Sequence, residues 1–308
     1  MKRSFIIGVD LGGTNLKIGL LGSNYKIITK KVLSTRSFIK KEQLISAIIN
    51  SIKALIRENR LSKKDLLGIG LGLPGPIDIK KGLVHFFPNI AGFKKVRLKR
   101  ILEKRLGLPV FLDNDANLMA LAEYRYGKAR GFKNAVCLTL GTGVGGGIII
   151  NGILYRGSGF SAGEIGHIPL NEEGPLCNCG GRACLETYIG NKAVIKEAKK
   201  IFNRDISLEE LSKLAREGDK RARLIWLRVA GRLGIALSGI INLLNPEVVV
   251  IGGGIAQAGK ILFDKLRKTI KERAMMVQAR QVKVLKAKLG NDAGLIGAGI
   301  LVKEGSRL

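Results

Sequence analysis

A repeated glycine turn constrains the fold of this chain more than any other feature. Val9-Asp10-Leu11-Gly12-Gly13-Thr14 near the start matches Leu138-Thr139-Leu140-Gly141-Thr142-Gly143 in the middle. In each copy an apolar strand leads into a turn of glycine and threonine, and a second apolar strand follows. An internal repeat of this kind predicts two similar lobes that face each other. The copies differ in one respect, because Thr139 stands where the first copy has Asp10.

The length agrees with two lobes, since the chain has 308 residues and single cores stop growing at about 250–300 residues. We expect a small N-terminal α/β lobe over residues 1–113, completed by the C-terminal helix at about 293–308. A large lobe would cover residues 114–292. No low-complexity linker separates the two, so the connections between them should be short.

Hydrophobic periodicity predicts strands that alternate with helices along the chain. The expected strands cover residues 4–10, 16–21, 26–34, 68–73, 110–112, 248–251 and 282–287. The expected helices cover residues 41–60, 97–106, 116–127, 192–202, 219–244 and 293–303. Residues 77–97 are predicted to form an irregular loop, in which the lone His85 is structural.

The glycine turns suit phosphate groups. Gly12 and Gly13 would present backbone N–H groups with no side chain in the way. Asp10, directly before them, is placed to hold Mg²⁺ directly or through water. Alone, this turn is equally compatible with a plain hairpin. The second copy strengthens the phosphate interpretation, and a third turn at Gly252–Gly254 suits the phosphate or ribose side of a nucleotide.

Asp113-Asn114-Asp115-Ala116-Asn117 lies where a strand becomes a helix. Strand ends are where α/β proteins place chemistry. A carboxylate here could take the proton from a substrate hydroxyl. The alternative is that Asp115 is only a helix N-cap, although two acids and two amides exceed what a cap needs.

A cysteine cluster follows in Gly163–Glu186. It contains Cys177, Cys179 and Cys184, with His167 ten residues before the first of them. Three thiols and an imidazole at this spacing are the ligands that a tetrahedral Zn²⁺ site needs. Free buried thiols, or a disulfide with one thiol left over, are the alternatives.

The net charge of +29 arises from 53 Lys and Arg against 24 Asp and Glu. Such a charge is typical of nucleic-acid binders. Here the basic residues are scattered over expected helix faces and aromatics are only 5%, which favours a solvated surface that also attracts anionic nucleotides. No signal peptide or membrane span is expected, and the clustered cysteines favour a reducing, cytoplasmic setting.

Six motifs together resemble the signature of the ROK family of sugar kinases, and the resemblance covers essentially the whole chain. They are Asp10–Thr14, Leu112–Asn117, Gly141–Gly147, Gly163–His167, Cys177–Glu186 and Gly252–Gly254. The combination of His with Cys-x-Cys-Gly-x-x-x-Cys-x-Glu is the most specific of them. One departure is Ala183, where the family usually has glycine before the last cysteine.

The resemblance implies an actin-like (ribonuclease H-like) two-lobed ATPase fold with a cleft between the lobes. It implies ATP- and Mg²⁺-dependent phosphorylation of a hexose, usually at the 6-hydroxyl, with glucose as the first candidate. Asp115 would be the general base, and His167, Cys177, Cys179 and Cys184 would hold a structural Zn²⁺. The expected sugar-binding residues are Gly75, Asn89, Asn114, Asp115, Glu164, His167 and Glu186. The expected ATP- and Mg²⁺-binding residues are Asp10, Gly12, Gly13, Thr14, Asn15, Lys17, Gly141, Thr142, Gly143, Gly253 and Gly254.

Other functions of the same family stay open. N-acetylglucosamine, N-acetylmannosamine and fructose kinases differ around the 2-position of the sugar, which one sequence does not reveal. A sugar-sensing ROK regulator is a remoter alternative, because Asp10 comes nine residues after Met1 and leaves no room for a helix-turn-helix. A homodimer or homotetramer is the habit of the family.

Overall fold

The computed structural model describes residues 5–87, 90 and 92–305, which form two compact units. The first unit contains the residues up to Ala122, the segment Leu154–Ala162 and the residues from Asn291 onwards. The second contains Glu123–Ile153 and Gly163–Gly290. The expected lobe division at residues 113 and 114 stays a prediction.

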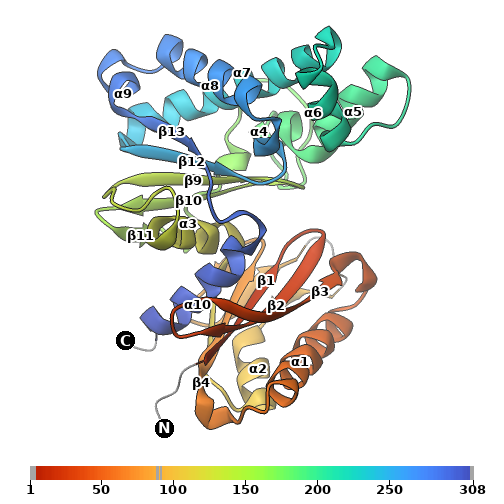
Figure 1. The fold of residues 1–308 in the computed structure, drawn as a ribbon, viewed down its shortest axis with the longest axis vertical. Coiled ribbons are helices and arrows are strands. Elements are labelled where there is room, and N and C mark those ends of the chain that lie inside the picture. The colour runs from red at the N-terminus through yellow and green to blue at the C-terminus, as the bar shows by residue number, and fades with distance from the viewer. Residues whose placement is uncertain (1–4, 88–89, 91, 306–308) are drawn as a thin grey trace. The chain divides into compact units, whose positions relative to one another are not determined.

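Each unit is built on a five-stranded sheet, and the two sheets share one strand order (Figure 1). In the first sheet the order is β3 (Ile27–Ser34), β2 (Asn15–Gly22), β1 (Phe5–Leu11), β4 (Leu66–Leu73) and β8 (Val110–Asn114). In the second it is β11 (Ile153–Tyr155), β10 (Val144–Ile150), β9 (Ala135–Leu140), β12 (Val248–Gly252) and β13 (Lys283–Lys286). Both central strands pair antiparallel with the hairpin strand after them and parallel with a later strand. The predicted internal repeat is therefore confirmed at the level of sheet topology.

Helices cover both faces of the first sheet. α1 (Lys41–Glu58) and α2 (Leu98–Leu106) bury leucines and isoleucines in one core with β1 and β4. α10 (Ala293–Gly305) packs on the opposite face. It approaches so closely that a Cβ atom on Gly70 would lie 2.0 Å from the Ala298 carbonyl oxygen. Only glycine at this position lets the C-terminal helix rest on β4.

The second sheet is covered by helices that follow the cysteine cluster in sequence (Figure 1). They are α4 (Leu185–Ile189), α5 (Asn191–Phe202), α6 (Leu208–Arg216), α7 (Lys220–Leu244), α8 (Lys260–Arg273) and α9 (Met276–Gln281). α7 was predicted over residues 219–244 and begins one residue later, because the Asp219 carboxylate caps it; the helix ends at Leu244, before Asn245. α7 has the length and hydropathy of a membrane-spanning helix, but its apolar face is core: Trp226 is fully buried there.

One sequence prediction was wrong, and two local features were not predicted. Residues 77–97 are not an irregular loop, because β5 (Ile77–Asp78), β6 (Leu83–Phe86) and β7 (Lys94–Val96) form a small antiparallel sheet. These strands are two to four residues long, too short for a periodic signal. The short helix α4 was not predicted. The third glycine turn leads first into a 3₁₀ helix at Ile255–Ala258 and only then into α8.

Candidate functional site

The first glycine turn is held by its own backbone and by one buried threonine. The N–H of Gly12 donates to the carbonyl of Asn15 at 2.9 Å. Thr35 donates its hydroxyl to the Gly12 carbonyl at 2.9 Å and its N–H to the Thr14 carbonyl at 2.8 Å. Gly12 and Gly13 are half-buried and Thr14 is exposed. The turn is thus held by Thr35 and by its own backbone, and Thr14 is exposed on its surface.

Asp10 and Lys17 face each other across the β1–β2 hairpin beside this turn. The Lys17 Nζ lies 3.1 Å from the Asp10 Oδ2 and donates to the Asn291 carbonyl at 2.7 Å. Burial raises the pKa of Asp10, and the Lys17 ammonium opposes this shift. A Cβ atom on Gly294 would lie 2.4 Å from the Asp10 carboxyl carbon, so glycine alone lets α10 begin against this carboxylate.

The second and third glycine turns lie side by side, at the ends of the parallel strands β9 and β12. The Gly141 carbonyl accepts the N–H of Asn191 at 3.0 Å, which ties this turn to the start of α5. Gly253 has a φ of +88°, and a Cβ atom there would lie 2.2 Å from the Leu140 carbonyl oxygen. The third turn can therefore reach the second only with glycine at this position.

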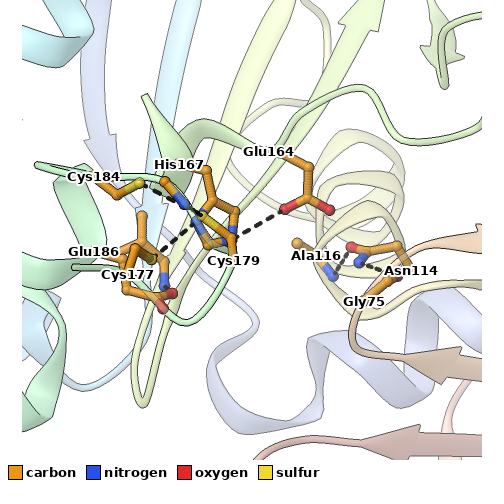
Figure 2. Close-up of polar contacts among 11 residues, drawn as sticks. Gly75, Asn114, Ala116, Glu164, His167, Cys177, Cys179, Cys184 and Glu186 are labelled. Carbon is orange, nitrogen blue, oxygen red and sulfur yellow. Dashed lines mark hydrogen bonds and ion pairs between the residues drawn. The ribbon is translucent and has the colours of Figure 1, made fainter. Parts of the chain in front are cut away.

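Asn114, and not Asp115, caps α3 (Asp115–Tyr126). The Asn114 Oδ1 accepts the backbone N–H of Ala116 at 2.9 Å (Figure 2). It also accepts the backbone N–H of Asn117 at 3.3 Å. The Asn114 amide also lies 3.4 Å from the Gly75 carbonyl. Asp115 is the first residue of the helix and is partly exposed. The Asp115 Oδ1 also accepts the Ala116 N–H at 2.9 Å, so both side chains contact the first turn of α3, and the catalytic role of Asp115 stays a prediction.

The four predicted metal ligands converge (Figure 2). One ligand atom from each of His167, Cys177, Cys179 and Cys184 lies within 4.8 Å of all the others. The Cys177 Sγ lies 3.6 Å from the His167 Nδ1, and the Cys179 and Cys184 sulfurs are 3.7 Å apart. Tetrahedral Zn²⁺ with Zn–S bonds of about 2.3 Å would place sulfurs about 3.8 Å apart and a sulfur about 3.6 Å from a nitrogen. The donor set and its spacing therefore fit zinc, with no disulfide among these cysteines.

The backbone around the cluster is strained at one point. Ala183 has a φ of +54°, a conformation that favours glycine, at the position where the sequence departs from the ROK pattern. Isolated β-bridges pair Pro169 with Cys184 and Leu176 with Arg182, and so close the loop that carries the cysteine cluster. A hydrogen bond from the Gly181 N–H lowers the pKa of the exposed Cys179, whereas burial raises the pKa of Cys184 to about 12.

The cluster holds two carboxylates beside it. Glu164 places an oxygen 3.8 Å from the His167 Nε2, the ring nitrogen that faces away from Cys177 (Figure 2). Burial raises the pKa of Glu164; His167 opposes the shift and Glu186 adds to it. Glu186 lies in the first turn of α4, two residues after Cys184, and accepts the N–H of Val144 at 2.8 Å. Glu186 thus links the cysteine cluster to the strand that follows the second glycine turn.

The predicted site residues divide between the two compact units. Gly75, Asn114, Asp115, Asp10 and the first glycine turn belong to the first unit, and the cysteine cluster, Glu164, Glu186 and the other turns belong to the second. Asn89 lies outside the described residues. His85 is exposed on β6, and its structural role stays a prediction. Sequence reasoning missed Thr35 and Asn191. Thr35 supports the first turn through its hydroxyl and its N–H, and Asn191 supports the second through its N–H, contacts between residues distant in sequence that no local pattern indicates.

Comparison with known proteins gives this arrangement a family. The sequence pattern of the ROK family matches residues 6–305. This chain belongs to the ROK family. A glucokinase from Thermotoga maritima is 37% identical over 318 residues, which cover 99% of each chain. A ROK family glucokinase from Streptomyces griseus, solved in complex with glucose and AMPPNP, is 33% identical with a TM-score of 0.86 and covers 98% of this chain and 100% of its own.

The ROK family also contains regulators with this fold. A xylose repressor from Caldicellulosiruptor bescii is 32% identical over 305 residues, which are 95% of this chain and 76% of the repressor. The similarity to the Streptomyces griseus structure confirms the predicted actin-like ATPase fold.

Proposed function

We propose that this protein phosphorylates a hexose at its 6-hydroxyl with ATP and Mg²⁺, and that glucose is the substrate. The observation that carries the proposal is the position of Asp115. Its carboxylate stands at a strand-to-helix junction whose capping is done by Asn114. The chain that holds it is similar along 99% of its length to a glucokinase.

Asp115 acts as the general base. Phosphoryl transfer asks the protein for positioning and charge neutralisation more than for covalent chemistry. The carboxylate accepts the hydrogen of the sugar hydroxyl and directs its oxygen at the γ-phosphorus. The oxygen–phosphorus bond forms, the bond from phosphorus to the bridging oxygen of ADP breaks, and the proton passes to Asp115.

The sugar is bound by groups that accept or donate hydrogen bonds in fixed directions. Carboxylates suit this task, because each accepts several hydrogen bonds. Glu164 and Glu186 supply two of them, and the His167 Nε2 supplies a further polar contact. Asn114 and Gly75 are fixed to each other by a hydrogen bond, and Asn89 completes the proposed set.

The phosphates of ATP are bound by backbone N–H groups of the glycine turns. The residues involved are Gly12, Gly13, Thr14, Asn15, Gly141, Thr142, Gly143, Gly253 and Gly254. The Asp10 carboxylate, beside the Lys17 ammonium, is an oxygen ligand of the kind that Mg²⁺ prefers. Mg²⁺ held there would offset the negative charge that develops on the phosphates.

The zinc site serves structure. Four protein ligands leave no open position for water or substrate. His167 would bind zinc through Nδ1 and keep Nε2 for Glu164 or the sugar. Cys184 precedes Glu186 by two residues, so a filled site would hold that carboxylate and His167 in place.

A coupled assay of ADP release with a panel of hexoses tests the proposal. We expect turnover with glucose, ATP and Mg²⁺, and none without the sugar. Turnover only with N-acetylglucosamine, N-acetylmannosamine or fructose would keep the mechanism and change the substrate. No turnover with any sugar, in a folded protein that binds glucose, would contradict the kinase function.

That last outcome would favour a second candidate, a sugar-sensing regulator, which the similarity to a xylose repressor supports. We also propose that the protein works in the cytoplasm as a homodimer or homotetramer. Light scattering coupled to size-exclusion chromatography measures the mass in solution. A value of 33 kDa, the mass of one chain, would contradict the oligomer.

A further inference from the structure

A buried ion pair with no role so far lies directly before Asp115. The Asp113 side chain is 2% exposed, and its Oδ2 accepts a hydrogen bond from the Arg156 Nε at 2.8 Å and lies 2.7 Å from the Arg156 Nη2 in an ion pair. Arg156 is 43 residues further along the chain, in the segment Leu154–Ala162 of the same compact unit. Both nitrogens meet the same oxygen, and because the guanidinium group is planar they restrict the direction of approach as well as the distance.

The other oxygen of Asp113 braces the turn on both sides of Asp115. The Asp113 Oδ1 accepts the backbone N–H of Asn114 at 2.8 Å and the side-chain amide of Asn117 at 3.0 Å. Asn117 is itself buried, at 1% exposure. The residue before Asp115 and the residue two places after it are therefore tied to one carboxylate. Its orientation is set by Arg156.

Arg156 also closes the loop that leads to Glu164. Its backbone carbonyl accepts the N–H of Ala162 at 3.0 Å, and Gly163 and Glu164 follow directly. Gly157 and Gly163 have φ values of +69° and +89°, which this short loop needs to turn back on itself. Arg156 thus supports the end of β8, directly before Asp115, through its side chain, and the segment before Glu164 through its main chain.

We propose that Arg156 is a positioning residue for phosphoryl transfer, which acts through Asp113 to aim Asp115 at the sugar hydroxyl. The inference rests on the proposed function, since it takes Asp115 as the base. Removal of the guanidinium leaves Asp113 as a buried charge without its partner. The carboxylate then turns toward other donors or water, and the residues around Asp115 lose their common anchor. Small misplacements of a reacting group are costly for rate, of the order of 100-fold for about 1 Å.

Steady-state kinetics of Arg156→Met and Arg156→Lys test the proposal, with Arg204→Met as a matched control. Arg204 pairs with Glu210 on the exposed surface of the other unit. We expect Arg156→Met to lower kcat about 10- to 100-fold, to raise the KM for glucose and to leave the KM for ATP unchanged. Arg156→Lys keeps the charge but loses the planar pair of donors, so its kcat should lie between those of the wild type and Arg156→Met. The control should match the wild type.

A double-mutant cycle separates positioning from general loss of stability. In an Asp115→Asn background, Arg156→Met should reduce the single-turnover rate less than twofold, because the group on which it acts is gone. Equal losses in both backgrounds, an unchanged kcat in Arg156→Met, or a KM for ATP that rises with the loss of kcat would each overturn the proposal. Should Arg156→Met fail to fold, Arg156→Lys decides by the same criteria. A wild type without turnover would instead refute the proposed function.

Discussion

At the scale of single residues, Asn114 and Asp115 divide the work at the start of α3. Asn114 accepts the N–H groups of Ala116 and Asn117, as a helix cap does. The Asp115 Oδ1 also accepts the Ala116 N–H, at 2.9 Å. Because Asn114 keeps both of its bonds when the Asp115 carboxylate is replaced, the replacement should affect chemistry much more than folding.

The first prediction follows from this division. Asp115→Asn should lower kcat by about 10²- to 10⁴-fold, the usual contribution of a positioned general base. Its thermal unfolding temperature should stay close to that of the wild type. The coupled assay and differential scanning fluorimetry measure the two quantities. Asp205→Asn, at an exposed position paired with Lys199, is the control. A variant that retains more than half of the wild-type kcat would contradict the assignment of the base.

A pair of neighbouring glycines provides the second prediction. Gly253→Ala should destabilise the fold by roughly 1–3 kcal/mol and raise the KM for ATP. The reason is that its Cβ atom would lie 2.2 Å from the Leu140 carbonyl oxygen, at a φ of +88°. Gly254→Ala is the matched control for stability alone, because Gly254 is itself a proposed ATP-binding residue; it has a helical φ of −62° and nothing within 4 Å of its Cβ position. Chemical denaturation should separate the two variants, and an equal loss of stability would contradict this account of the third turn.

At the scale of elements, the segment that carries the cysteine cluster has little regular secondary structure. Residues 163–184 contain one short 3₁₀ helix and two isolated bridges. Backbone hydrogen bonds join parts of this segment, such as the Leu170 N–H to the Ala183 carbonyl at 2.9 Å and the Cys177 N–H to the Gly181 carbonyl at 2.8 Å. A metal bound by the four ligands would add to the order of the segment. α4 follows the last cysteine of the cluster, and its first turn carries Glu186.

The third prediction concerns the metal content of this cysteine cluster. The purified protein should contain about one zinc per chain, and Cys179→Ser should lose it. The variant should then show a lower unfolding temperature and a higher KM for glucose, because His167, Glu164 and Glu186 lose their common anchor. Mass spectrometry of the metal content gives the stoichiometry. Cys137→Ala, which removes a buried cysteine of β9 outside the cluster, should keep its zinc. Wild-type protein without zinc and with full activity would contradict the prediction.

How far the sequence predicted each element depends on its length and its contacts. The long strands and helices, such as α7 after Asp219, were predicted because their apolar residues recur with a clear period. The small sheet β5–β7 was missed because its strands are too short to show one. The ligands of the cluster were found because their chemistry is rare and local. The pair of Arg156 with Asp113 could not be found, since only tertiary folding joins residues 43 positions apart.

At the scale of the whole molecule, the charge of +29 remains to be connected with function. A protein with this excess of Lys and Arg carries a positive potential over its surface. Such a potential raises the local concentration of anions and speeds their association. ATP carries several negative charges, whereas glucose carries none. The surface should therefore favour one substrate over the other, and salt should reveal the difference.

The fourth prediction is that ionic strength separates the two substrates. Salt shortens the range of surface charges from about 10 Å at 0.1 M to about 3 Å at 1 M. Over this range the KM for ATP should rise about 3- to 10-fold, while the KM for glucose at saturating ATP should change less than twofold. Titration with sodium chloride and with potassium glutamate would exclude an effect of one particular ion. If both KM values rise together, salt acts on the fold or the active site itself, and the surface charge has no part in nucleotide capture.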